Sequence, residues 1–136
     1  MNESQTQTLC RQLHTIDTSL AFLVLLILSV CLSWGATAIQ RGGLCRILLG
    51  ETKEFPDVYP IRLAASAIVA GALTFFFGLA LDTWQEAREQ DEEARRSACL
   101  NLWAALFVLA AGIIRLCDLI EVRRRQPDLE QEILPD

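Results

Sequence analysis

The chain has 136 residues, of which 52% are hydrophobic and 21% charged, with a net charge of −5 at pH 7. So large an apolar fraction excludes a disordered chain, the length allows one domain, and the acidic balance leaves no basic face for nucleic acid. Three stretches of the chain contain no charged residue: 18–40, 63–81 and 97–114. Since roughly 20 apolar helical residues cross a bilayer core, we expect an all-α protein in which residues 1–136 form a single three-span membrane domain, a three-helix transmembrane bundle in contact with membrane lipids. The predicted spans are about 18–40, 61–81 and 97–119.

The first span follows a polar segment, residues 1–15. Asp17 or Thr18 is a suitable N-terminal cap, and Trp34 lies near the far end of the span, at the depth where aromatic side chains meet the bilayer interface. A cleaved signal peptide is the alternative interpretation, because Ala36 and Ala38 resemble a cleavage site. The residues before the apolar run include two acids against one arginine, which does not match the basic start of such a peptide.

Between the first two spans the sequence predicts a break at Gly42 and Gly43. Residues 44–49 are too few to cross a membrane, so they either continue the first helix or form a turn at the interface. Residues 50–60 read as a polar loop with two prolines, the second of which, Pro60, suits the first turn of the next helix.

The second and third helices are predicted to extend beyond the membrane as a hairpin. No glycine or proline occurs between Gly78 and Gly112, and the intervening residues favour helix. We place the obligatory reversal at residues 89–91, with Asp91 capping the third helix. That helix is expected to end near Val122, and residues 123–136 are predicted to be a disordered tail.

The distribution of basic residues predicts the orientation in the membrane. One side of the expected topology carries four arginines, Arg11, Arg88, Arg95 and Arg96. The other side carries eight basic residues, Arg41, Arg46, Lys53, Arg62, Arg115, Arg123, Arg124 and Arg125. Because cytoplasmic loops are enriched in Lys and Arg, we expect a cell (plasma) membrane protein with its N-terminus outside and its C-terminus in the cytoplasm.

Each predicted span carries a line of small or polar residues at helical spacing. The side chains or glycines concerned are Ser29, Ser33 and Thr37 in the first span, Ser66, Gly71, Thr74 and Gly78 in the second, and Asn101, Arg115 and Asp118 in the third. In the third span the line also includes Ala104, Val108, Ala111 and Val122, with alternating spacings of three and four. These residues either pack helices together in lipid or line a water-filled path.

Two charged groups near the end of the third span have separate interpretations. Arg115 and Asp118 are expected to form an interfacial ion pair, or else a ring of charge at a pore mouth or a contact to another subunit. The cluster Arg123, Arg124 and Arg125 is a topology signal and a candidate contact for anionic lipid headgroups.

Catalysis and cofactor binding are poorly supported by the sequence. No serine, cysteine or threonine has a histidine at a spacing suited to nucleophilic catalysis, and no glycine-rich phosphate loop is present. Cys10 and His14 share a helical face, but a zinc site needs three or four ligands. We therefore expect no enzyme activity, no catalytic residue, no metal site and no cofactor.

Two functions follow as hypotheses. The first is a self-associating protein that forms a homo-oligomeric channel or pore, because three helices leave more polar surface than one chain buries. The alternative is a non-conducting accessory or regulatory subunit that docks another membrane protein. No internal repeats are visible, which argues against transport by alternating access.

Overall fold

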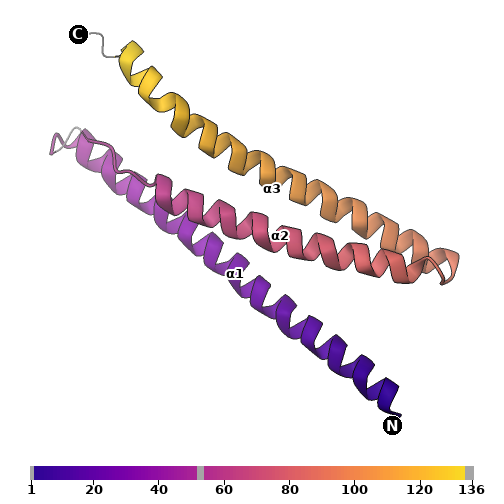
Figure 1. Ribbon diagram of the computed structural model, residues 1–136. Helices are drawn as coiled ribbons and strands as arrows, with labels where there is room; N and C mark the ends of the chain where they lie inside the picture. Colours follow the sequence, from indigo (N-terminus) through magenta and orange to yellow (C-terminus); the bar gives the residue numbers. More distant parts are fainter. Residues whose placement is uncertain (1, 52–53, 134–136) are drawn as a thin grey trace.

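The computed structural model describes residues 2–51 and 54–133, with side chains for 2–51 and 54–125. It contains three α-helices, α1 (Glu3–Leu48), α2 (Tyr59–Ala87) and α3 (Glu92–Ile133), and no strand within those residues. The helices run back and forth, so that the loop after α1 and the end of α3 lie at one end and the turn between α2 and α3 at the other (Figure 1). The predicted all-α architecture with three helices is confirmed.

All three helices are long and apolar enough to cross a membrane, which is compatible with a multi-pass membrane protein. The 46 residues of α1 extend over about 69 Å at 1.5 Å per residue, whereas the hydrocarbon core of a bilayer is about 30 Å thick. The helices are thus longer than the spans predicted from the charge-free stretches, which lie inside them.

The break predicted at Gly42 and Gly43 is wrong, because α1 continues through both glycines to Leu48. The residue that turns the chain out of the helix is Gly50, two positions after Leu48, and its φ of 75° is in the left-handed region. Gly50 N–H donates to the carbonyl of Ile47 and Glu51 N–H to that of Arg46, at 3.1 and 3.0 Å, which is a Schellman ending. Glycine inside a helix costs only about 1 kcal/mol relative to alanine, so the pair alone does not end α1.

The other ends of the helices agree better with the sequence. Pro60 lies in the first turn of α2, as predicted. α2 ends at Ala87 and α3 begins at Glu92, so the reversal falls where it was expected. α3 then continues to Ile133, across most of the segment predicted to be disordered, while residues 134–136 lie outside the described residues.

Asp91 caps α3, since its Oδ1 accepts the backbone N–H of Ala94 at 3.1 Å. Replacing Asp91 with alanine is expected to cost about 0.5–2 kcal/mol of helix stability, because this N–H of the first turn loses its acceptor. Hydrogen exchange of the first turn of α3 measures the effect. Asp91→Asn is the matched control and retains protection, and equal exchange in both variants would contradict the capping role.

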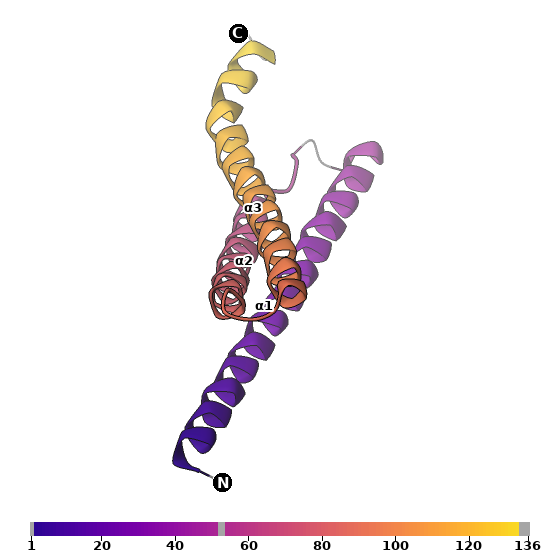
Figure 2. The same ribbon diagram turned by 90° about the vertical axis from the view of Figure 1, so that its right-hand side faces the viewer.

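The three helices do not close into the expected bundle around a shared core. α2 contacts both α1 and α3, whereas α1 and α3 make no contact with each other over the described residues. Viewed along the α2–α3 pair, α1 crosses at an angle and its N-terminal part runs clear of the other helices (Figure 2). α2 therefore lies between α1 and α3, and over the described residues it is the helix that packs on both of the others.

The most deeply buried positions between the helices are occupied by small residues. Apart from Val58 and Gly112, the residues classed as buried in the described part of the chain are alanine or serine: Ser29, Ala36, Ala65, Ala72, Ala80, Ala87 and Ala98. Large apolar side chains such as Val24, Trp34 and Phe107 are more than half exposed, at 63%, 74% and 67%. Small residues at the contacts and large apolar ones outside are typical of helices packed in lipid, where no hydrophobic effect drives helices together.

Candidate functional site

The polar line of α1 lies largely on the contact with α2. Residues of α1 that are buried or half-buried recur every three or four positions, at 22, 26, 29, 33, 36, 40, 43 and 47. Ser29 is 2% exposed and Ser33 is half-buried within this series. On the same face the Phe22 ring stacks on that of Phe75 in α2, with centroids 4.2 Å apart and an angle of 12° between planes. In a single chain, Ser29 and Ser33 therefore belong to a helix-packing surface.

At one end of this contact, an arginine of α2 binds two polar side chains of α1. The Nη2 of Arg62 donates to Oε1 of Gln40 at 2.7 Å and lies 3.4 Å from Oγ1 of Thr37. The Thr37 hydroxyl itself donates to the carbonyl of Ser33 at 2.9 Å. Sequence reasoning noticed Thr37 but did not assign Arg62 and Gln40 to the site. The sequence did contain a hint of this contact, because Arg62 is a basic residue in the first turn of the second helix, next in the topology to the polar end of the first.

The four candidate positions of α2 are dispersed. Ser66 and Gly78 are half-buried, whereas Gly71 and Thr74 are exposed. A Cβ atom built on Gly71 or Gly78 meets nothing within 4 Å, so neither glycine permits a close helix contact inside the chain. The hydroxyl of Thr74 donates to the carbonyl of Ala70 at 2.8 Å, which satisfies it without a partner helix.

The polar line of α3 does not face α2. Asn101, Arg115 and Asp118 are all exposed, together with Ala104, Val108, Ala111 and Val122. The face that packs on α2 consists of residues 98, 102, 105, 109, 112, 116 and 119. These residues also follow one another at spacings of three and four, but from 102 onward each lies one position after a residue of the polar line. We call the exposed line, 101, 104, 108, 111, 115, 118 and 122, the α3 polar seam.

Gly112 is the close contact that sequence reasoning missed. It is buried, and a Cβ atom built on it lies 2.9 Å from Cδ1 of Leu73 and 3.9 Å from Cγ1 of Val69 in α2. Gly43 is a second missed position, because its added Cβ lies 2.5 Å from Cδ of Pro56 in the loop after α1. At both glycines a neighbouring side chain comes so close that any larger residue would displace it.

The expected ion pair between Arg115 and Asp118 does not occur in the part of the chain that the structure describes. Both side chains are exposed, and the ion pairs of this part join other residues. A charge in the hydrocarbon core is costly, and such groups normally pair or face water. Among the described residues, neither group has an ion-pair partner within the chain.

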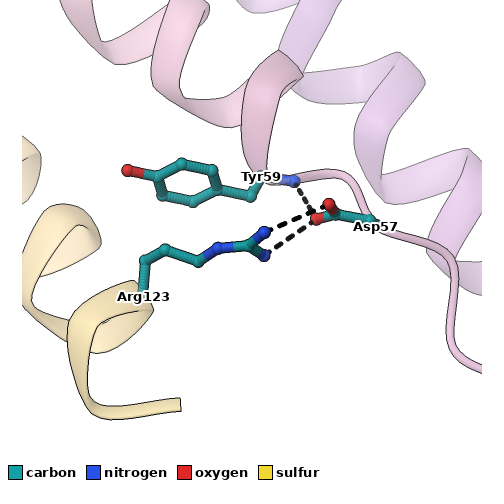
Figure 3. A network of polar contacts seen from close by, with 3 residues as sticks. All are labelled: Asp57, Tyr59 and Arg123. Atoms are coloured by element: carbon teal, nitrogen blue, oxygen red, sulfur yellow. Dashed lines mark hydrogen bonds and ion pairs between the residues drawn. The ribbon is translucent and has the colours of Figure 1, made fainter. Parts of the chain in front are cut away.

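The arginines after the third span divide into different environments. Arg123 forms a forked ion pair with Asp57 of the loop after α1, with Nη1 and Nη2 at 3.2 and 3.4 Å from the two carboxylate oxygens. Its guanidinium also lies over the ring of Tyr59, 4.8 Å from the centroid (Figure 3). Asp57 in turn accepts the backbone N–H of Tyr59 at 3.2 Å. Arg125 pairs with Glu121 at 2.6 Å, and Arg124 is exposed.

Replacing Asp57 with asparagine is expected to loosen the loop from α3 at a cost of about 1 kcal/mol or less. Both side chains of the pair are about half exposed, at 44% and 57%, and exposed ion pairs contribute little. Thiol labelling of Val58→Cys in a cysteine-free chain, at a position that is 5% exposed as valine, measures the loosening as faster reaction. Glu51→Gln in the same loop serves as control, and equal labelling rates would contradict the role given to the pair.

Among the open grooves between the helices, two involve α1. The larger, about 920 Å³, separates the N-terminal part of α1 from the C-terminal part of α2, with Arg11 on one wall and Asp82, Glu86 and Glu89 on the other. The second, about 500 Å³, lies among all three helices. It is lined by Leu23 and Leu26 of α1, by apolar residues of α2, and by Asn101, Ala104 and Val108 of the α3 polar seam.

The described residues contain no group of three or more His, Cys, Asp or Glu side chains arranged to hold a metal. All five cysteines are free. No protein-family model matches the chain, and neither a similar curated protein nor a similar solved structure was found.

Proposed function

We propose that the protein is an integral membrane protein that self-associates and forms an oligomeric channel or pore. The observation that supports this is the α3 polar seam, which places an amide and two charged groups on the outside of the predicted span 97–119, where the other exposed side chains are largely apolar. Inside a membrane, exposed polar groups need protein or water as partners. Copies of the chain that assemble around a water-filled path provide both kinds of partner, protein and water.

The end of the molecule at the α2–α3 turn gives the proposed pore an electrostatic character. Between residues 82 and 98 there are six acidic residues and three arginines. Three of the acids, Asp82, Glu86 and Glu89, line the groove beside α1. The three acids outweigh Arg11 on the opposite wall, and a cleft of net negative charge raises the local concentration of cations, so the pore is proposed to prefer cations over anions.

The proposed orientation places the loop after α1 and the end of α3 in the cytoplasm. The ion pair of Asp57 with Arg123 puts these two segments at the same end of the molecule. This end carries the larger group of basic residues, and such an end faces the cytoplasm. The cell (plasma) membrane is the proposed location.

Flux from liposomes that contain the purified protein tests the proposal. Cation efflux that exceeds anion efflux, and that falls when Asp82, Glu86 and Glu89 are changed to Asn or Gln together, is expected. A cysteine introduced at Thr74 of a cysteine-free chain should react with a water-soluble thiol reagent, while one at the buried Ser29 should not. Absence of flux for several ions and potentials would contradict a pore.

The groove among the three helices favours a second candidate function. Its apolar lining from Leu23, Leu26 and Val108 suits a helix of another membrane protein. In that case the chain is a non-conducting accessory or regulatory subunit. Silent liposomes together with a single copy per detergent micelle would support this function over the pore.

A further inference from the structure

The α3 polar seam combines small residues with polar ones in a regular order. Numbered as a heptad, Asn101, Val108, Arg115 and Val122 take the a positions, and Ala104, Ala111 and Asp118 the d positions. This is the pattern of a helix that meets another helix along a narrow line, with small residues that let the backbones approach. Since α2 occupies a different face of α3, the partner lies outside this chain.

The membrane restricts how a second copy meets this seam. Copies inserted with the same topology carry α3 in the same direction, so two α3 helices meet in parallel. A two-fold axis along the membrane normal then brings each seam position near its own counterpart. In a parallel pair an a position also lies beside the d position of the other helix.

The charges of the seam are complementary under this symmetry. Arg115 at an a position falls beside Asp118 of the other copy, and the reverse contact forms at the same time, which gives two equivalent ion pairs. Asn101 meets its counterpart at another a position, where paired asparagines favour a parallel register of two strands. Every polar member of the seam therefore finds a partner in an identical chain.

The groove among the three helices agrees with the same partner. Asn101, Ala104 and Val108 form one wall of this groove, and Leu23 and Leu26 of α1 form the other. A parallel helix laid along the seam enters the groove between α1 and α3, which do not contact each other.

We propose that the α3 polar seam is a homodimer interface in which two α3 helices pack in parallel, with Arg115 of each copy paired to Asp118 of the other. The proposal deepens the proposed function, because it names the contact by which copies associate, and it rests on self-association but not on conduction.

Co-expression of differently tagged copies tests the interface. A copy with Arg115→Asp carries two acids on the seam, and a copy with Asp118→Arg carries two arginines. Each is expected to avoid itself and to co-purify with the other, with mixed pairs in excess by on the order of ten-fold. As control, Arg124→Asp makes the same charge change about 180° around α3 from Arg115 at 100° per residue. Paired with Asp118→Arg, it should show no such excess.

A second comparison keeps the number of charges constant, so that it does not depend on the folding of the single variants. The double variant Arg115→Asp with Asp118→Arg is expected to associate with itself as the natural chain does. Each swapped copy again places one acid and one arginine beside the arginine and the acid of the other copy, so the two crossed ion pairs are restored.

Loss of self-association in the double variant would overturn the interface, and so would equal recovery of all pairings of the single variants. Liposome flux of the same samples separates the two proposals. Flux without pairing preference would contradict the interface alone, whereas pairing preference without flux would contradict the pore alone.

Discussion

Replacing Gly112 with leucine is expected to force α3 away from α2 and to destabilise the α2–α3 hairpin by about 1–3 kcal/mol, the usual cost of inserting bulk into a packed contact. The first added carbon already lies 2.9 Å from Cδ1 of Leu73, which must move, and the remaining leucine atoms need space that Val69 also borders. An increased distance between spin labels on α2 and α3 of a cysteine-free chain measures the effect.

Gly71→Leu is the matched control for this experiment. Gly71 lies in the middle of α2, and a Cβ atom there meets nothing within 4 Å. Both changes replace a helical glycine with leucine and gain similar helix propensity. An unchanged distance in both variants would show that α2 and α3 do not depend on close approach at Gly112.

Replacing Arg62 with leucine is expected to weaken the attachment of α1 to α2 by about 1.5–3 kcal/mol, the range for a hydrogen bond from a charged donor. The bond from Nη2 of Arg62 to Oε1 of Gln40, at 2.7 Å, is the shorter of its two contacts with α1. Without it, the half-buried amide of Gln40 loses this hydrogen-bond donor at the edge of the predicted span. Reversible unfolding in mixed detergent measures the loss.

A double-mutant cycle separates this hydrogen bond from other effects of the two substitutions. Gln40→Leu alone should cost a similar amount, and the double variant should cost clearly less than both together. Arg62→Lys keeps the charge and replaces the forked guanidinium with a single ammonium, so it should retain part of the stability. Additive costs would mean that Arg62 and Gln40 act independently.

Helix number and several boundaries were predictable because they depend on local signals. Three long charge-free stretches predict three helices, and Asp91 has a side chain that can cap a helix. Pro60 suits a first turn because the backbone N–H that proline lacks would have no partner within the helix there. The end of α1 was misplaced because three glycines lie close together there. Only Gly50 adopts a positive φ, and composition does not distinguish it from Gly42 and Gly43.

The faces of the helices were harder to predict than their positions. In water, apolar periodicity identifies the buried side, but in lipid both the outer and the packed faces are apolar. The line chosen for α3 from its small and polar residues is exposed, while leucines with Ala98 and Gly112 contact α2. The contacts of Arg62 with Gln40 and of Arg123 with Asp57 depend on which helix ends meet, which the order of spans suggests but their residues do not determine.

In most proteins the large buried residues are the most sensitive to substitution in a mutational scan. Because alanines occupy the helix contacts of this protein, the opposite is expected here. Ala72 is 1% exposed and Ala36 is 0% exposed, so even a modest enlargement at either separates two helices. At Val24 or Ile27, which are more than 60% exposed, one aliphatic side chain replaces another without disturbing a neighbour. In this protein, sensitivity to substitution follows the smallest residues rather than the largest.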